Sequence, residues 1–136
     1  MKKLFVSVPM KGRTEEEIKE SINKMHRIAE AYEDEKLELI DSYVAESPPA
    51  SCSQSVWYLS KSIEKLAEAD IFIGIRDTAS WAGCRIEADV AKAYNIKSYR
   101  VDNDLLLDAS KMLTHTIANL MDIYNINDDL RSVQIR

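Results

Sequence analysis

The distribution of apolar positions along the chain predicts strands and helices in alternation. The run Ile71-Phe72-Ile73-Gly74-Ile75 is rich in β-branched residues and too short for most helices, so it predicts a buried parallel strand. Further apolar runs predict strands at 4–8, 37–40 and 96–101. The first of these strands is closed by Pro9, which cannot donate to a ladder.

Between these runs, apolar residues recur at spacings of three and four, which is the pattern of one helix face. This spacing predicts helices at about 15–34 and 55–69, a third after the strand at 71–75, and a last one running to about Tyr124. Thr14 and Glu17 have the spacing of a capping box at the start of the first helix. Asn95 stands where a Gly often ends a helix.

Strands that alternate with helices indicate an α/β fold with a mainly parallel sheet, right-handed crossovers and helices on both faces. We expect one domain over residues 1–136, a flavodoxin-like or Rossmann-like three-layer sandwich. The expected strand order is 2-1-3-4, with or without a fifth edge strand at 132–135. This order brings the ends of strands one and three together and gathers the loops at 9–14 and 76–83 around one crevice.

Charge and composition narrow the classes of partner. The formal charge of −5 and pI of about 5.1 argue against binding to a nucleic acid polymer or an anionic membrane and favour a small ligand. No apolar stretch approaches the length of a membrane span or signal peptide, so a cytoplasmic location is expected. Cys52 and Cys84 lack metal-ligand spacing. We therefore expect no metal site and reduced thiols. We also expect no cofactor.

The stretch from Asp70 to Tyr94 carries a resemblance to a known family. An apolar strand, a loop with an acid and a Trp, and the segment GCRIEADVAKAY at 83–94 resemble the nucleoside 2-deoxyribosyltransferase superfamily, closest to its small bacterial and phage branch. The resemblance covers about residues 3–102. It implies a nucleoside or nucleotide ligand and assigns to Glu87 the attack on the sugar C1′ that displaces the base.

The chemistry fits that assignment. A retaining cleavage of an N-glycosidic bond needs a carboxylate within reach of C1′ and an acid that assists the leaving group. Asp77, in the loop directly before the helix of Glu87, is the candidate acid. A lone helical Glu is more often a solvated surface residue, and Asp70, at the start of its strand, is expected to be a structural anchor.

The loop Pro9-Met10-Lys11-Gly12-Arg13 is the second candidate segment. A strand, loop and helix start of this kind can hold a phosphate on backbone amides, but it has one Gly and no GxGxxG or Walker pattern. An ordinary connecting loop with solvated basic residues explains it equally well. The resembling branch uses a Pro-Met-x-Gly loop in its pocket. The candidate substrate-binding residues are Ser7, Pro9, Met10, Gly12, Trp81 and Gly83, and the candidate phosphate-binding residues are Lys11 and Arg13.

Two departures from the family keep a second function open. An acid that helps relatives to hold the sugar or base corresponds here to Ser62, and another corresponds to Trp81. The chain is therefore predicted to be either an enzyme that cleaves or transfers at the N-glycosidic bond, or a binding module that senses or sequesters a nucleotide without cleaving it.

The remaining segments carry weaker indications. The polar loop at 41–54 is long enough to serve as a lid over a pocket. Trp57 and Tyr58 are expected to pack in the core or against another subunit, and together with the resemblance they predict a homo-oligomer. His26 and His115 are expected to be solvated or structural.

Overall fold

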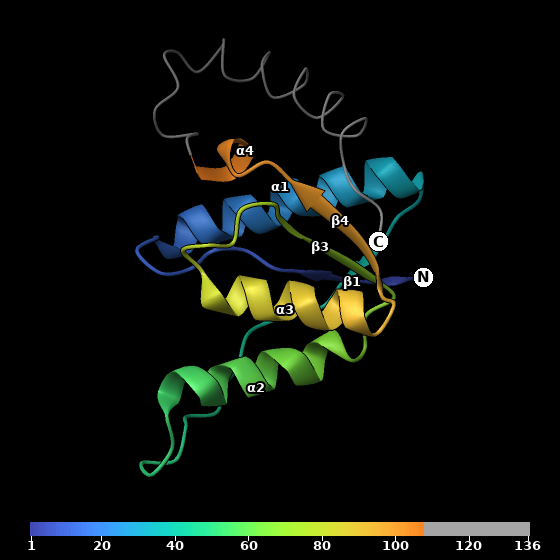
Figure 1. Cartoon of the computed structure of the whole chain (residues 1–136). Coiled ribbons are helices and arrows are strands. Elements are labelled where there is room, and N and C mark those ends of the chain that lie inside the picture. Colours follow the sequence, from blue (N-terminus) through green and yellow to red (C-terminus); the bar gives the residue numbers. More distant parts are fainter. Residues whose placement is uncertain (108–136) are drawn as a thin grey trace.

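The computed structural model describes residues 1–107, in which four parallel strands form one sheet in the order β2-β1-β3-β4 (Figure 1). The strands are β1 (Lys3–Val6), β2 (Glu38–Leu39), β3 (Ile71–Ile75) and β4 (Lys97–Val101). The α/β class and the strand order 2-1-3-4 are confirmed. The edge strand predicted at 132–135 lies outside the described residues.

Helices cover both faces of this sheet. They are α1 (Glu15–Glu33), α2 (Gln54–Leu66), α3 (Ala82–Ala93) and α4 (Asp104–Leu107). Figure 1 shows α1 and α4 on one side of the sheet and α2 and α3 on the other. The last predicted helix begins within α4, but its extension to Tyr124 lies outside the described residues, as does His115.

Side-chain alternation along the strands divides the core into two parts. Leu4, Val6, Ile71, Ile73, Tyr99 and Val101 point toward α1 and pack with Met25, Ile28 and Ala29. Phe5 and Phe72 point the other way and pack with Leu66 of α2 and with Ala88 and Ala91 of α3. The Phe5 and Phe72 rings stack at 6.0 Å between their centroids. Burial on both faces explains the continuous apolar run of β3.

Helix ends follow the local chemistry of the sequence. Thr14 and Glu17 form the predicted capping box, in which the Glu17 amide donates to Thr14 Oγ1 at 3.1 Å and the Thr14 amide donates to Glu17 Oε1 at 3.0 Å. Asn95 adopts the left-handed φ of 61° expected for a residue that ends a helix, and Asp34 does the same after α1 with φ 56°. Strand limits are shorter than predicted: β1 ends at Val6, although the Ser7 amide still donates to Ile73 O at 2.9 Å.

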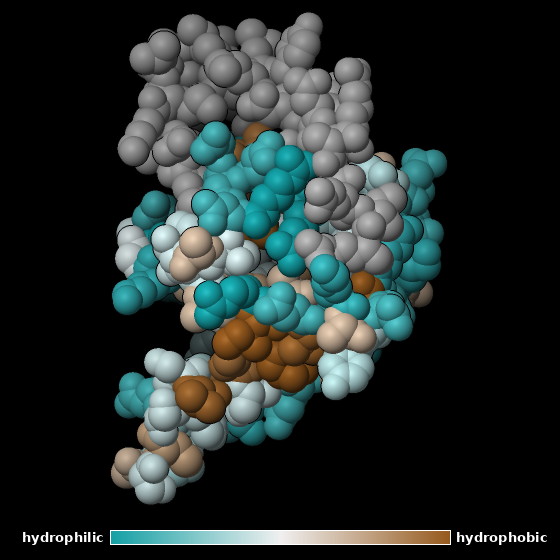
Figure 2. All heavy atoms as spheres, viewed as in Figure 1, coloured by the Kyte–Doolittle hydropathy of each residue, from teal (hydrophilic) through white to brown (hydrophobic). Residues whose placement is uncertain are grey.

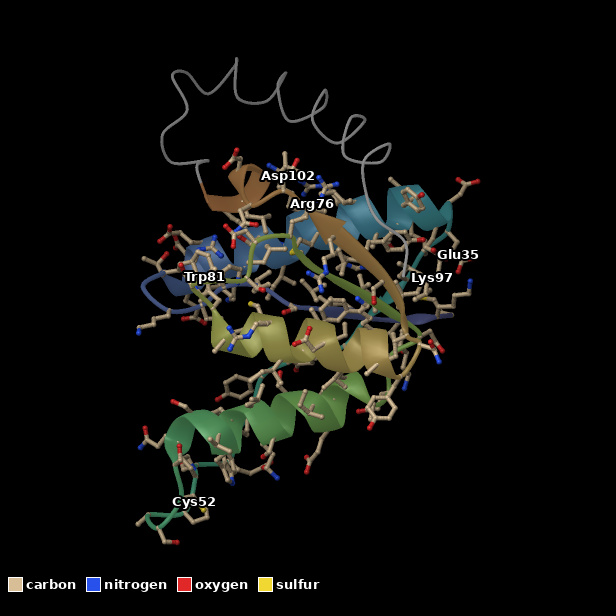
Figure 3. All side chains as sticks on the ribbon, viewed as in Figure 1. Glu35, Cys52, Arg76, Trp81, Lys97 and Asp102 are labelled. Atoms are coloured by element: carbon tan, nitrogen blue, oxygen red, sulfur yellow. The ribbon has the colours of Figure 1, made fainter. Side chains whose placement is uncertain are left out.

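Charged side chains form hydrogen bonds and an ion pair at the end of the sheet where the parallel strands begin. Asp70 Oδ2 accepts the Lys3 amide at 2.8 Å, which confirms Asp70 as a structural anchor. On the same edge Glu33 accepts from Tyr99 and pairs with Lys97 at 2.6 Å (Figure 3 labels Lys97). Burial alone would raise the pKa of Glu33, but the bonds from Lys97 and Tyr99 hold it below its ordinary value. These contacts lie at the amino ends of the strands, opposite the carboxyl ends at which the crevice is predicted.

The outer surface of α2 carries two exposed hydrophobic residues, Val56 and Tyr58. A groove runs along it, lined by Val56, Leu59, Ser60, Ile63, Glu64 and Ala67. Figure 2 shows apolar residues gathered over α2 and α3 on this side. Within residues 1–107, no helix has the length and apolar character needed to cross a membrane.

Candidate active site

The carboxylate of Glu87 lies buried between three elements. It belongs to α3, its residue is only 8% exposed, and each of its oxygens accepts a hydrogen bond. Ser7, which follows β1, donates its hydroxyl to Oε1 at 2.7 Å. Ser62 of α2 donates its hydroxyl to Oε2 at 2.5 Å. Glu87 is therefore not the solvated surface residue that a lone helical Glu most often is.

The alternation of β1 explains why Ser7 meets Glu87. Because Phe5 points toward α2 and α3, Ser7, two residues later, points to the same face. Its backbone amide donates to Ile73 O at 2.9 Å, which fixes it beside β3. A Cβ added at Gly74 would stand 3.6 Å from Ser7 Cβ, so the Gly leaves the space beside this serine open. The cluster thus lies where the strand order reverses, between β1 and β3, the position at which open α/β sheets bind ligands.

Burial and hydrogen bonding act in opposite directions on the ionisation of this site. Burial raises the pKa of Glu87 above its ordinary value of 4.5, while the hydroxyls of Ser62 and Ser7 oppose that rise. Cys84 lies one turn earlier in α3. The pKa of its thiol is raised to about 11, chiefly by burial and also by the charge of Glu87, while the contact with Ser7 opposes the rise. Cys84 is a buried neutral thiol, so Glu87 is the stronger candidate for a nucleophile.

The loop after β3 is tied to the segment after β4. Asn103 accepts the Asp77 amide at 3.1 Å and donates its side-chain amide to Asp77 O at 2.8 Å. Arg76 pairs with Asp102 at 3.0 Å in the same region (Figure 3). The exposed Asp77 carboxylate accepts the Ala79 amide at 3.1 Å. The described bonds of Asp77 thus hold the loop in shape rather than join it to Glu87, and its catalytic role stays a prediction.

Trp81 and Gly83 stand at the start of α3. Figure 3 shows Trp81 at the beginning of this helix, where it is partly buried against the core. It takes the N-cap position without a side-chain capping bond. Gly83 lies in the first turn, and a Cβ added there would meet nothing within 4 Å. Their predicted part in substrate binding is untested by these contacts.

The loop after β1 is a turn that its single Gly makes possible. The Arg13 amide donates to Met10 O at 3.1 Å, and Gly12 between them has φ +78°. Pro9 is fully buried, whereas Met10 is 50% exposed and Lys11 lies on the surface.

Arg13 itself is used within the chain. Its guanidinium donates to Pro9 O at 2.9 Å, to Glu17 O at 3.3 Å and to Ser21 Oγ at 2.6 Å. The capping box also satisfies two of the backbone amides at the start of α1 that an anion would use. These contacts give the phosphate site predicted at Lys11 and Arg13 no support, and it stays a prediction.

Comparisons with known proteins bear on the fold. No protein-family model matches the chain, and no curated protein matches it. Among solved structures, the chain is similar to a conserved protein from Enterococcus faecalis V583. The TM-score is 0.54 at 16% sequence identity, and the likeness covers 96% of each chain. At this identity the likeness shows the fold alone.

The contact from Ser62 is the part of the site that sequence reasoning missed as a functional residue. The sequence identifies Ser62 only as a position at which an acid of the resembling family is replaced. The signal that could have found it is its helix position, because Ser62 and the buried Leu66 are four residues apart and share the inner face of α2.

Within residues 1–107, no three His, Cys, Asp or Glu side chains come together in an arrangement able to hold a metal ion.

Proposed function

We propose that the protein cleaves or transfers at the N-glycosidic bond of a nucleoside or nucleotide through Glu87. The observation that carries this proposal is the buried Glu87 carboxylate, held by two hydroxyl groups beside the end of β1. Burying a carboxylate costs desolvation free energy. Buried titratable groups with a shifted pKa cluster at functional sites. The resemblance of residues 83–94 supplies the reaction.

In this reaction an oxygen of Glu87 bonds to C1′ as the bond between C1′ and the base nitrogen breaks. The electron pair of that bond leaves with the base, which takes a proton from a loop group, in this proposal Asp77. A glycosyl ester of Glu87 remains. Water then attacks C1′ in a hydrolase, or a nitrogen of a second base does so in a transferase, and the bond from C1′ to Glu87 breaks. Asp77, ionised in the first step, takes the proton from this nucleophile, and Glu87 is released as a carboxylate. Ionised Glu87 is the reactive form, so the serine hydroxyls that favour it also favour reaction.

A second candidate function is favoured by the same hydrogen bonds. Each carboxylate oxygen already accepts a hydrogen bond from a serine, and Ser62 stands in place of an acid of the resembling family. A site of this kind fits a module that binds a nucleotide-like ligand without cleaving it. The two functions differ in one observable, the release of free base.

The proposal also includes self-association. Val56 is 64% exposed and Tyr58 is 45% exposed on α2, beside the apolar groove. An apolar helix face of this kind is typical of a surface that packs against another protein chain. The small-molecule ligand and the oligomer are parts of one proposal, in which α2 links the outer surface to the site through Ser62.

Base release from a panel of nucleosides and 5′-monophosphates, followed by chromatography, tests the reaction. We expect release from at least one member by the wild type and at least a hundredfold less by Glu87→Gln, a loss of the order that removal of a catalytic group produces. Asp89→Asn is the matched control, because it removes an exposed carboxylate from the same helix. Circular dichroism checks the fold of each variant.

The outcomes separate the two functions. Release by Glu87→Gln at the wild-type rate would exclude the nucleophile. Absence of release by the wild type across the whole panel, with binding of a nucleotide seen by calorimetry, would establish the binding module instead.

A further inference from the structure

Ser62 makes a hydrogen bond that its helix position does not require. Serines inside helices usually return their hydroxyl to a carbonyl of the preceding turn. Ser60, two residues earlier in α2, does this, since its Oγ donates to Trp57 O at 2.6 Å. Ser62 instead reaches across to α3 and donates to Glu87 Oε2 at 2.5 Å. The bond therefore belongs to the contact between the two helices.

The surroundings of Glu87 make this bond consequential. The carboxylate faces Ser7 from the end of β1, Ser62 from α2, and the neutral Cys84 on its own helix. Among residues 1–107, no lysine or arginine contributes to the ionisation of Glu87. A buried carboxylate without a cation beside it needs hydrogen bonds from hydroxyl or amide donors to stabilise its ionised form. The two serines are the donors here.

The two serines differ in how firmly they are held. Ser7 is fixed by the backbone bond from its amide to Ile73 O in the sheet. Ser62 is carried by α2, in which Leu66 is the one buried residue and which packs on α3. The hydrogen bond to Glu87 Oε2 therefore depends on the packing of α2 against α3.

We propose that Ser62 is a positioning residue, which holds the nucleophile Glu87 by its second carboxylate oxygen and so makes α2 part of the reacting site. The reactive role of Glu87 in this statement rests on the proposed function. The hydrogen bond and its effect on the charge of Glu87 do not.

Nuclear magnetic resonance of the Glu side-chain carboxyl carbon tests the bond without reference to activity. The Glu87 signal is assigned by its loss in Glu87→Gln, and its titration midpoint is compared between the wild type, Ser62→Ala, Ser62→Thr and Ser60→Ala. We expect a higher midpoint in Ser62→Ala, because a donor to the charged form is lost. Ser62→Thr keeps a hydroxyl and is expected to restore the wild-type midpoint, and Ser60→Ala controls for the same change on the same helix. An unchanged midpoint in Ser62→Ala would overturn the proposal.

The pH profile of kcat/KM for base release is the second readout. In Ser62→Ala the acid limb is expected to move to higher pH, with about tenfold less release at a fixed pH on that limb, as for loss of a hydrogen bond to a charged group. Ser62→Thr is again expected to restore it. An unmoved acid limb would overturn the role of Ser62 in the reaction.

The two readouts keep the failures distinguishable. If the wild type releases no base while the midpoint shifts in Ser62→Ala, the proposed reaction fails and the hold of Ser62 on Glu87 stands. If the wild type releases base through Glu87 and neither readout moves in Ser62→Ala, the reaction stands and Ser62 has no positioning role.

Discussion

Replacing Glu87 by Gln should increase the stability of the fold, and the increase should grow with pH. The folded-state pKa of Glu87 lies above 4.5 because the side chain is buried. Between 4.5 and its folded-state pKa, such a carboxyl binds more protons in the folded than in the unfolded protein. At low pH it is protonated in both states and does not change the free energy of unfolding. As pH rises from 4.5 through the folded-state pKa, it lowers the free energy of unfolding. The Gln side chain does not ionise in this pH range, so the free energy of unfolding of the variant should not show this decrease.

The size of the effect follows from the distance between the two pKa values. Each unit by which the folded-state pKa exceeds 4.5 costs the wild type about 1.4 kcal/mol at a pH above both. Gln occupies nearly the same volume, and the Ser7 and Ser62 hydroxyls can each accept from its NH2 group or donate to its oxygen. At pH 4 we therefore expect the two proteins to agree within about 0.5 kcal/mol, as for a well-tolerated substitution.

Urea unfolding followed by circular dichroism, at intervals between pH 4 and pH 8, measures this difference. Glu64→Gln is the matched control, since it makes the same substitution at an exposed position of α2 and should give a nearly flat difference. A Gln variant that is less stable than the wild type, with a deficit that widens as pH rises, would refute the reasoning. It would show that native contacts favour the charged form by more than burial opposes it.

Two further predictions concern the sheet and the surface. Gly74→Ala should lower the free energy of unfolding in urea by about 1–3 kcal/mol, because its Cβ would meet the buried Phe72 ring at 2.9 Å; Gly83→Ala, with open space around the added carbon, should not, and equal stability of both variants would contradict the prediction. Sedimentation velocity at micromolar concentration should show an oligomer that Val56→Glu weakens. Tyr94→Glu is the control and should not weaken it, because Tyr94 is 77% exposed but does not line the groove. A wild-type monomer would exclude self-association.

The arrangement of strands and helices was predictable because it depends on periodicity. The β-branched run of β3, the apolar stripes of the helices and the capping box at Thr14 each carry local signals, and right-handed crossovers leave few orders for four parallel strands. The ends of the strands were less predictable. Ser7 keeps a ladder bond to Ile73 although β1 ends at Val6, and such limits depend on how the neighbouring strand continues.

The site was predictable only in part. The strand order alone brings the end of β1 near the helix that follows β3, and so brings Ser7 near Glu87. The contact of Ser62 depends on how closely two helices pack side by side, which periodicity does not specify. Arg13 has a similar explanation. Its long side chain turns along α1 to Ser21, eight residues away, and a pattern of basic residues in a loop does not show which way they turn.

The three residues at the site come from distant parts of the chain, and this has a consequence for local unfolding. The bond from Ser7 to Glu87 spans 80 residues and the bond from Ser62 spans 25. Because α2 has one buried residue and α3 has four, we expect α2 to detach more readily than α3 while the sheet stays folded. Such an opening would break one of the two bonds and admit water to the carboxylate. Hydrogen exchange of α2 amides would then report how often the molecule opens in this way. In the open state Glu87 is solvated, keeps only the hydrogen bond from Ser7, and has a pKa closer to its ordinary value.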